Sequence, residues 1–370
     1  MILDRIMTDH DRALTDDSEL DFNYEVLEAD YSPTAPRLRR FLDRKKLMNA
    51  ATSFFKRHGV DVVVLFSDTR MEEYRIVLAA KALGLPTVLI PDGFVLPETP
   101  GYRRPLLSQI KLHTVAKWFE TRRPRGTSGV DRILMMNRSG QGDFDSVGVG
   151  NRVRTIGSAE YDELFERTIE TDRTSHQREL RLKYGLPTDK KILVFAHQMA
   201  ADQEQINDLI LKLAAIARSL DILLLVKLHP RTSDDPDKWQ QKLKTRGLDQ
   251  HAVFMKNDVT SIDAVWMADA CVTVVSTMGL EAMITGIGLL IIKYIPSPRL
   301  LSYHKDYGAV VDVESEEDLA DHIDRIINDE DYIADINQKA LVALRTDIFI
   351  GESSSIRRTI DEVCKIADAL

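Results

Sequence analysis

The feature that most constrains the fold of this chain is the alternation of apolar runs of strand length with amphipathic helices. In the first half, the apolar run 62–66 is followed by a helix predicted over 71–83. In the second half, the run 192–196 is followed by a helix predicted over 203–220, whose apolar residues have helical spacing. Continuous apolar strands joined by helices are typical of parallel sheets covered on both faces. The pattern therefore predicts an α/β protein built from doubly wound, Rossmann-like sheets.

A chain of 370 residues exceeds the usual size of a single hydrophobic core, so two domains are expected. We predict an N-terminal domain over 1–170 and a C-terminal domain over 171–350, facing each other across a cleft. A C-terminal helix within 351–370 can pack back on the first domain. The apolar residues expected to share one face of this helix are Ile356, Ile360, Val363 and Ala367.

Composition excludes several classes of protein. The net charge of −9 argues against a general nucleic-acid binder, because neutralising phosphates requires a basic face. Only Cys271 and Cys364 are present, so neither a disulfide framework nor a cysteine zinc site can form. The sequence has no apolar leader and no uncharged apolar run long enough to span a membrane. We therefore expect a cytoplasmic protein that is not integral to a membrane.

The first polar turn with candidate chemistry follows the apolar run 222–226. It reads Lys227, Leu228, His229, Pro230, so a buried strand delivers a cation and an imidazole to one edge of a sheet. The proline gives the turn a defined geometry, and the imidazole can hold a phosphate oxygen. The alternative is a histidine that only caps the end of a strand.

A second polar turn follows the run 270–275 and precedes a predicted helix. Its candidate groups for a phosphate are the hydroxyls of Ser276 and Thr277 and the backbone N–H groups of Met278 and Gly279. A hydroxyl-rich helix cap would have the same sequence.

Two further side chains are expected at the same edge of the sheet. Glu281 lies one helical turn beyond the second turn, where its carboxylate can accept both hydroxyls of a ribose; otherwise it is an acidic residue favoured near a helix N-terminus. His197, at the end of the strand 192–196, can line the same cleft.

Asp92 is the candidate general base. It follows the predicted strand 87–90 in a Pro-Asp-Gly turn, where a carboxylate can face a cleft, although such turns are equally common as purely structural features. Asp68 is a weaker competitor. No His, Asp or Glu cluster has metal-ligand spacing, so metal-independent chemistry is the simpler prediction.

Residues 102–125 form a basic amphipathic segment with an aromatic edge. Such a segment can lie on anionic lipid head groups at the inner face of the cytoplasmic membrane, or hold an acidic acceptor. The alternative is a solvated surface helix. The candidate contact residues are Arg103, Arg104, Lys111, Lys117, Trp118, Arg122 and Arg123.

Several of these motifs together resemble a known superfamily. The segment 157–162 (Gly-Ser-Ala-Glu-Tyr-Asp), the Lys-Leu-His-Pro turn, and the segments 274–277 and 280–282 with Gly286 are similar to bacterial GT-B glycosyltransferases. The most similar groups are capsular and surface polysaccharide transferases and CDP-glycerol glycerophosphotransferases, and the non-hydrolysing UDP-N-acetylglucosamine 2-epimerases share the fold. The histidine-proline and serine-threonine turns also resemble the CMP-binding pair of bacterial sialyl- and Kdo-transferases.

The resemblance implies a metal-independent glycosyltransferase with an acceptor-side first domain and a second domain that binds a nucleotide-activated donor. Such an enzyme moves a sugar or polyol phosphate to a growing cell-surface glycan or lipid-linked acceptor, and needs no cofactor beyond its co-substrate. His229, Ser276, Thr277 and Glu281 are the implied donor contacts. We expect Asp92 to assist proton transfer and His229 to stabilise the leaving group with the Ser276 turn.

Two alternatives stay open. The first is a non-hydrolysing nucleotide-sugar 2-epimerase, although Thr277 and Met278 stand where the epimerase phosphate loop has tandem glycines. The second is a non-catalytic protein that only binds a sugar nucleotide.

Overall fold

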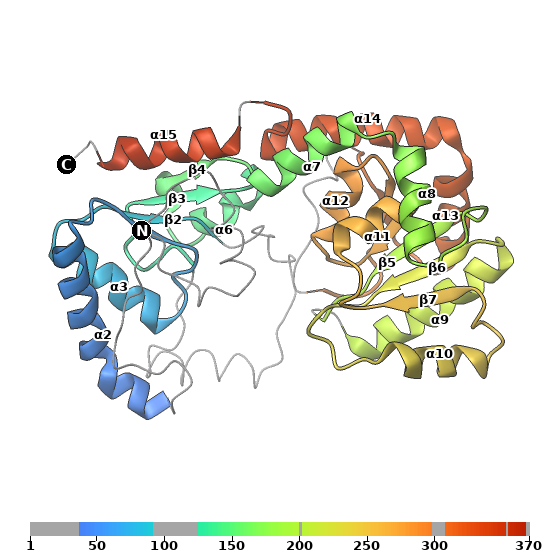
Figure 1. The fold of residues 1–370 in the computed structure, drawn as a ribbon, viewed down its shortest axis with the longest axis horizontal. Coiled ribbons are helices and arrows are strands. Elements are labelled where there is room, and N and C mark those ends of the chain that lie inside the picture. Colours follow the sequence, from blue (N-terminus) through green and yellow to red (C-terminus); the bar gives the residue numbers. More distant parts are fainter. Residues whose placement is uncertain (1–36, 92–124, 200–201, 298–307, 353, 368–370) are drawn as a thin grey trace. The chain divides into compact units, whose positions relative to one another are not determined.

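The structure is a computed structural model that describes residues 37–91, 125–199, 202–297, 308–352 and 354–367. The chain divides into two compact units, which are described separately (Figure 1). The first unit comprises Met1–Val95, Arg104–Ile156 and Ile356–Leu370. The second comprises Leu96–Arg103 and Gly157–Ser355.

The described part of the first unit contains a parallel sheet of four strands in the order β1-β2-β3-β4. The strands are β1 (Val63–Leu65), β2 (Thr87–Leu89), β3 (Arg132–Met135) and β4 (Val153–Thr155). The helical segments are α2 (Arg37–His58), α3 (Met71–Ala82), η2 (Arg138–Gly140), α6 (Gln141–Asp145) and η3 (Gly150–Arg152). Buried residues of α2 and α3, including Phe55 and Val77, pack on the sheet in one hydrophobic cluster. Gly59 and Gly84 follow these two helices with positive φ angles, as expected of glycines that end helices.

The C-terminal helix α15 (Ser355–Ala367) packs with the first unit, through only part of the expected apolar face. Ile366 is buried in a cluster with Val88 and Leu134, whereas Ile356 and Ile360 are 57% and 53% exposed. The Arg358 side chain donates a hydrogen bond of 2.7 Å to the carbonyl oxygen of Ile156. Of the four residues expected to share an apolar face, Val363 therefore packs against this cluster, whereas Ile356 and Ile360 stay exposed.

The described part of the second unit contains a six-stranded parallel sheet in the order β10-β9-β8-β5-β6-β7. The strands are β5 (Ile192–Ala196), β6 (Leu223–Lys227), β7 (Ala252–Met255), β8 (Ala270–Thr273), β9 (Gly288–Ile292) and β10 (Val311–Val313). After β7 the chain crosses to the other side of β5 and adds β8, so the strand order reverses between β5 and β8. In open α/β sheets, ligands bind at the carboxyl ends of strands flanking such a switch point.

The helices of the second unit begin at residues suited to capping. The helices are α7 (Ala159–Glu170), α8 (Arg173–Lys183), α9 (Gln203–Ser219), α10 (Pro236–Lys244), α11 (Ser261–Met267), α12 (Met278–Ile284), α13 (Leu319–Asn328) and α14 (Glu330–Ile348). The side chain of Asp202 accepts from the N–H of Glu204 at 2.9 Å and begins α9. Thr260 caps α11 in the same way, through the N–H of Asp263 at 2.9 Å.

Helix α7 lies in the second unit, although the predicted boundary at residue 170 assigned it to the first domain. Its residues contact α12, and Phe165 lies against Gly351 in the segment after α14. Asp162 accepts a hydrogen bond of 2.8 Å from the N–H of Ser355. The charged linker character of residues 170–175 suggested the later boundary, but contacts from distant parts of the chain place α7 with the second sheet.

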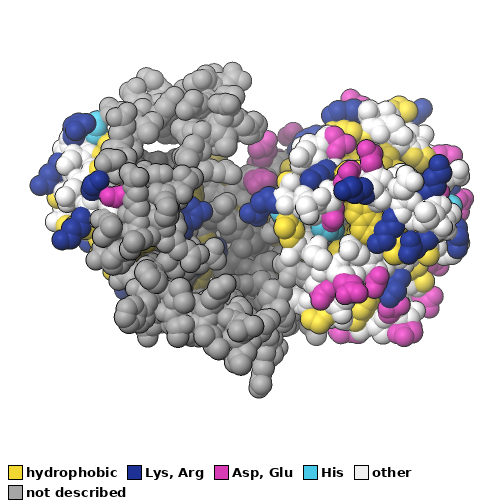
Figure 2. All heavy atoms as spheres, turned by 90° about the horizontal axis from the view of Figure 1, so that it is seen from below, with side chains coloured by type: hydrophobic (Ala, Val, Ile, Leu, Met, Phe, Trp, Pro, Cys, Tyr) yellow, Lys and Arg dark blue, Asp and Glu magenta, His cyan; other side chains and the backbone are white. Residues whose placement is uncertain are grey.

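Acidic and basic side chains are interspersed on the visible face of the second unit (Figure 2). Among the described residues, no helix combines the length and apolar character that crossing a bilayer requires.

Candidate functional site

A pocket of about 360 Å³ lies at the carboxyl edge of the second sheet, where β5, β6, β7 and β8 end. Its lining includes eight of the nine residues that were predicted from the two turns and their neighbours. These eight are His197, Lys227, His229, Pro230, Ser276, Thr277, Met278 and Glu281. Gly279 is buried in α12 behind the lining. The strand order explains the convergence, because it sets β5 between β6 and β8.

His229 presents one ring nitrogen for binding. Its Nδ1 accepts a hydrogen bond of 3.1 Å from the backbone N–H of Arg231, so in the neutral ring the proton is assigned to Nε2. Burial lowers the pKa of His229, and the positive charges of Arg231 and Lys227 lower it further. The neutral imidazole can therefore donate from Nε2–H to an oxygen in the pocket.

Lys227 has fewer N–H groups available to a ligand than its charge suggested. Its buried ammonium donates to the carbonyl oxygens of Lys256 at 2.5 Å and of Leu228 at 3.2 Å. Burial lowers the pKa of Lys227, although Asp258 and Glu281 act in the opposite direction. Two of its three N–H groups thus join the ends of β6 and β7, which makes Lys227 chiefly a structural cation beneath the pocket.

His197 is a second imidazole in the lining. Its side chain is fully buried, and Nε2 lies 3.5 Å from Oδ2 of Asp234. Neither ring nitrogen has a hydrogen-bond partner among the described residues. Burial lowers the pKa of His197, the Asp234 carboxylate partly offsets this, and His229 adds to the lowering. The Asp234 carboxylate is thus close to Nε2, and Nδ1 is left to pair with a ligand.

The serine-threonine turn is closed on itself, contrary to expectation. The Oγ of Ser276 accepts from the N–H of Met278 at 3.3 Å, and the Ser276 carbonyl accepts from the N–H of Gly279 at 3.0 Å. The two backbone N–H groups expected to bind phosphate are therefore already bonded. Helix α12 is only seven residues long, so its dipole adds little. The side chains of Ser276 and Thr277 remain as the lining groups of this turn.

Glu281 is a buried carboxyl group that is only half satisfied. It is 6% exposed, and its Oε1 accepts a hydrogen bond of 3.1 Å from the Ser261 hydroxyl. Its Oε2 is buried without a partner among the described residues. Burial raises the pKa of Glu281 to about 7; Glu160 adds to the rise, while the Ser261 bond and Lys227 oppose it. A ligand hydroxyl donating to Oε2 would satisfy this group.

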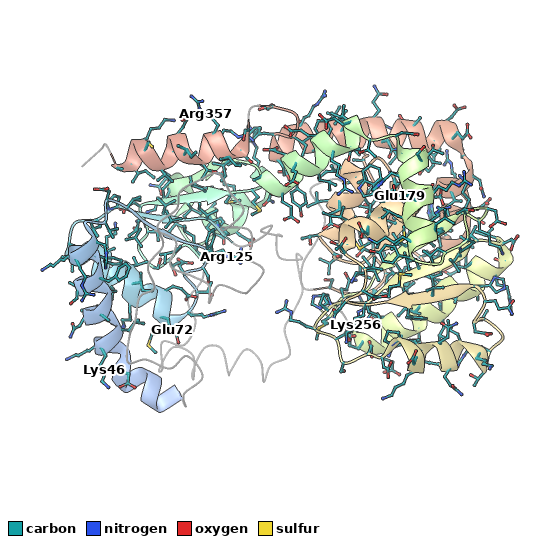
Figure 3. All side chains as sticks on the ribbon, viewed as in Figure 1. Lys46, Glu72, Arg125, Glu179, Lys256 and Arg357 are labelled. Atoms are coloured by element: carbon teal, nitrogen blue, oxygen red, sulfur yellow. The ribbon has the colours of Figure 1, made fainter. Side chains whose placement is uncertain are left out.

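One wall of the pocket was not predicted from the sequence: the turn between β7 and α11. Its lining residues are Lys256, Asn257, Val259, Thr260 and Ser261, and Lys256 is labelled in Figure 3. The Lys256 ammonium donates to the carbonyl oxygen of Thr232 at 2.7 Å, which joins this turn to the one that follows His229. This turn has the same sequence feature as the turns after β6 and β8, namely polar residues between an apolar strand and a helix.

Asp68, the weaker candidate base, is occupied by structural bonds. Its buried carboxylate accepts from the N–H of Gly126 at 2.9 Å and from the N–H and hydroxyl of Ser128 at 3.2 and 2.7 Å. A carboxylate with three donors is poorly placed to take a further proton from a substrate. It instead joins the end of β1 to the segment before β3.

Other predicted residues lie outside the described part of the chain. They are Asp92 and the basic segment residues Arg103, Arg104, Lys111, Lys117, Trp118, Arg122 and Arg123. Within the described ranges, no three His, Cys, Asp or Glu side chains gather in a possible metal site. The catalytic role of Asp92, the membrane or acceptor role of the basic segment, and metal independence all stay predictions.

Comparisons with known proteins find similarity only at the level of structure. No protein-family model matches the sequence, and a search of curated proteins finds no significant match. A glycosyltransferase from Rickettsia africae is 12% identical, with a TM-score of 0.62, and the match covers 99% of this chain and 89% of that one. Anabaena HepE in complex with UDP-glucose is 14% identical, with a TM-score of 0.58 and coverage of 89% and 84%.

A putative UDP-N-acetylglucosamine 2-epimerase from Listeria monocytogenes is 13% identical, with a TM-score of 0.60, and covers 97% of this chain and 85% of its own. At such identities the likeness establishes the fold alone. It confirms the predicted α/β class and the predicted type of fold. The chain has the GT-B fold, with two Rossmann-like parallel-sheet units.

Proposed function

We propose that this chain is a glycosyltransferase that binds a nucleotide-activated donor in the second-unit pocket. The observation that carries the proposal is the convergence of His229, Ser276 and Glu281 on one cavity at the switch point of the sheet. The cavity volume of about 360 Å³ falls in the range of roughly 300–1,000 Å³ typical of small-molecule sites. The transfer is of a sugar, or a polyol phosphate, to a cell-surface glycan or lipid-linked acceptor.

Each group in the pocket has a part in holding such a donor. The Nε2–H of His229 and the hydroxyls of Ser276 and Thr277 donate to the oxygens of a phosphate or pyrophosphate. The free Oε2 of Glu281 accepts from a ribose hydroxyl. Donors already aligned at the phosphate stabilise the negative charge that develops when the donor bond breaks.

In the sugar-transfer step, an acceptor hydroxyl oxygen bonds to the anomeric carbon while the bond to the nucleotide phosphate oxygen breaks. The electrons of that bond leave on the phosphate, where His229 and the Ser276 turn face it. The proton of the acceptor hydroxyl passes to a carboxylate, for which Asp92 is the predicted base. No cofactor or metal ion is assigned to this step.

Structural neighbours support the choice of a nucleotide sugar. HepE has been solved with UDP and with UDP-glucose, and the 2-epimerase of Neisseria meningitidis with UDP-N-acetylglucosamine. Because epimerases share the fold, a nucleotide-sugar 2-epimerase is the second candidate. It needs no acceptor, so incubating the protein with UDP-N-acetylglucosamine alone distinguishes the two: epimer formation in buffer supports the epimerase.

The donor site is tested with a thermal-shift panel of CMP, CDP, UDP, GDP and ADP. A nucleotide that binds the folded state raises the unfolding midpoint by mass action. We expect at least one to do so, and His229→Ala and Glu281→Gln to reduce the shift strongly. His322→Ala is the matched control, because His322 lies on α13 and does not line the pocket. If no nucleotide moves the midpoint of the wild-type protein, the donor site is wrongly assigned.

A further inference from the structure

Gln198 lies at the switch point, directly after His197. The hydrogen-bonded ladder between β5 and β8 pairs Phe195 with Val272 as its last register partners. Beyond that pair, the chain after β5 forms the wall that carries His197, and the chain after β8 leads through Val275 into the turn that carries Ser276. The spacing between these two walls of the pocket is therefore not set by the strand ladder.

The side chain of Gln198 bridges the two walls. Its Oε1 accepts a hydrogen bond of 2.7 Å from the N–H of Val275 and one of 3.2 Å from the hydroxyl of Thr273. A backbone N–H can only donate, so the bond to Val275 identifies the oxygen of the amide. Gln198 is 4% exposed, and its Nε2 has no partner among the described residues. The amide thus holds the bridge through its oxygen alone.

The backbone of Gln198 is held in turn from the other side. Its carbonyl oxygen accepts a hydrogen bond of 3.1 Å from the side chain of Gln203, the first residue of α9. The bridge is therefore anchored to the start of a long helix whose apolar face is packed in the core of the second unit. A buried hydrogen bond with both ends held in this way restricts the position of the turn after β8.

We infer that Gln198 is a positioning residue that holds the Ser276–Thr277 turn at a defined distance from the His197 wall. It does not line the pocket, so it acts through the residues that do. The positioning role extends the proposed function. Its effect on nucleotide affinity rests on that function, because it requires that the pocket residues bind a nucleotide. Without the Gln198 oxygen, the buried N–H of Val275 loses its partner, and the turn must shift to hydrate it.

Three variants separate this role from a general loss of stability. Gln198→Met keeps the length of the side chain and removes the acceptor. Gln198→Glu keeps an acceptor oxygen in either protonation state and replaces an N–H group that has no partner by a second carboxyl oxygen. Gln240→Met is the matched control: it removes an amide that donates 2.7 Å to the carbonyl of Asp249 in the same unit, away from the pocket lining.

The first measurement is hydrogen exchange of the ligand-free protein, read in peptides spanning residues 273–280. We expect exchange about tenfold faster or more in Gln198→Met, near wild type in Gln198→Glu, and unchanged in Gln240→Met. Unchanged exchange in Gln198→Met overturns the inference. A Gln198→Glu variant that behaves like Gln198→Met also overturns it, because the acceptor oxygen would then not be what holds the turn.

The second measurement is the affinity for UDP, or for whichever nucleotide of the panel gives the largest thermal shift. We expect the Kd to rise by about tenfold in Gln198→Met and to stay within about twofold in Gln240→Met, even where both variants lose stability. Equal Kd values in Gln198→Met and wild type would overturn the positioning role. If no nucleotide binds the wild type, the proposed function fails, and the exchange result alone decides whether Gln198 holds the turn.

Discussion

At the scale of single residues, burial shifts the pKa values of the titratable groups that line the pocket. Lys227, His197 and His229 have pKa values below their ordinary range and Glu281 has one above it, in each case first because of burial. The Nε2 of His229 and the Oε2 of Glu281 therefore have hydrogen-bonding capacity that a ligand can meet. Such perturbed groups are concentrated at functional sites more often than elsewhere.

Glu281 should make the stability of the protein depend on pH. Its pKa rises from the ordinary 4.5 to about 7 in the folded state, so the folded state retains a proton that the unfolded state loses. The stabilisation present below pH 4.5 is therefore lost as the pH rises through about 7. In urea titrations, Glu281→Gln should gain stability over wild type between about pH 5 and pH 8, on the order of 3 kcal/mol at the upper end.

The exposed carboxylate of Glu330 offers a control, because Glu330→Gln removes a carboxylate of the same unit without touching the pocket. Parallel pH profiles for wild type and Glu281→Gln would show that Glu281 does not titrate in this way.

Asp68 should be important for the stability of the protein and unimportant for nucleotide binding. Asp68→Ala leaves the N–H groups of Gly126 and Ser128 without their buried acceptor, which should lower the free energy of unfolding by about 2–4 kcal/mol. The nucleotide-induced shift should persist, because the described residues that line the pocket belong to the second unit. Asp61→Ala, at an exposed position of the same unit, is the control. If Asp68→Ala instead had normal stability and no transfer activity, Asp68 would again be a candidate general base.

At the scale of elements, local pattern predicted the helices well and their packed faces less well. Asp202 and Thr260 begin helices as capping residues do, and Gly59, Gly84 and Gly185 follow helices with positive φ angles. Helix α15 is the exception, because its Ile356 and Ile360 mark an apolar stripe that the structure leaves exposed. Several apolar residues on one helix allow more than one packed face, and only the partner surface selects between them.

A pair of substitutions in α15 tests which face is packed. Ile366→Ala removes a buried side chain that contacts the first-unit sheet and should cost about 2–4 kcal/mol of unfolding free energy. Ile360→Ala removes an exposed one and should change it by less than about 0.5 kcal/mol. Chemical denaturation of both variants makes the comparison. Equal losses would mean that Ile360 is covered in solution.

At the scale of the whole molecule, the two units have separate hydrophobic cores. The main cluster of described residues in the second unit lies on one face of its sheet, where it includes Ile206 of α9 and Ile326 of α13, and it contains no residue of the first unit. Every described residue that lines the pocket also belongs to the second unit. Its fold and its pocket should therefore not require the first unit.

We expect a fragment of residues 157–355 to fold alone and to bind the same nucleotide as the intact chain, without transferring the sugar. Circular dichroism and calorimetric titration of the fragment make the measurement, and the fragment carrying His229→Ala is its control. A fragment that folds but binds no nucleotide would mean that the first unit completes the donor site. Loss of folding would contradict the independence of the two cores.

The sequence by itself determined the alternation of strands and helices, the ends of most helices, and the polar turns after β5, β6 and β8. These depend on neighbours within a few residues: apolar runs, capping side chains and glycines. Only the tertiary structure decided that β5 lies between β6 and β8, that the Met278 and Gly279 N–H groups are bonded within their own turn, and that Gln198 bridges two walls. Crossovers join segments that are far apart in the chain, and the burial of a group depends on all the residues around it. A local sequence pattern therefore predicts neither the strand order nor the hydrogen bonds of buried groups.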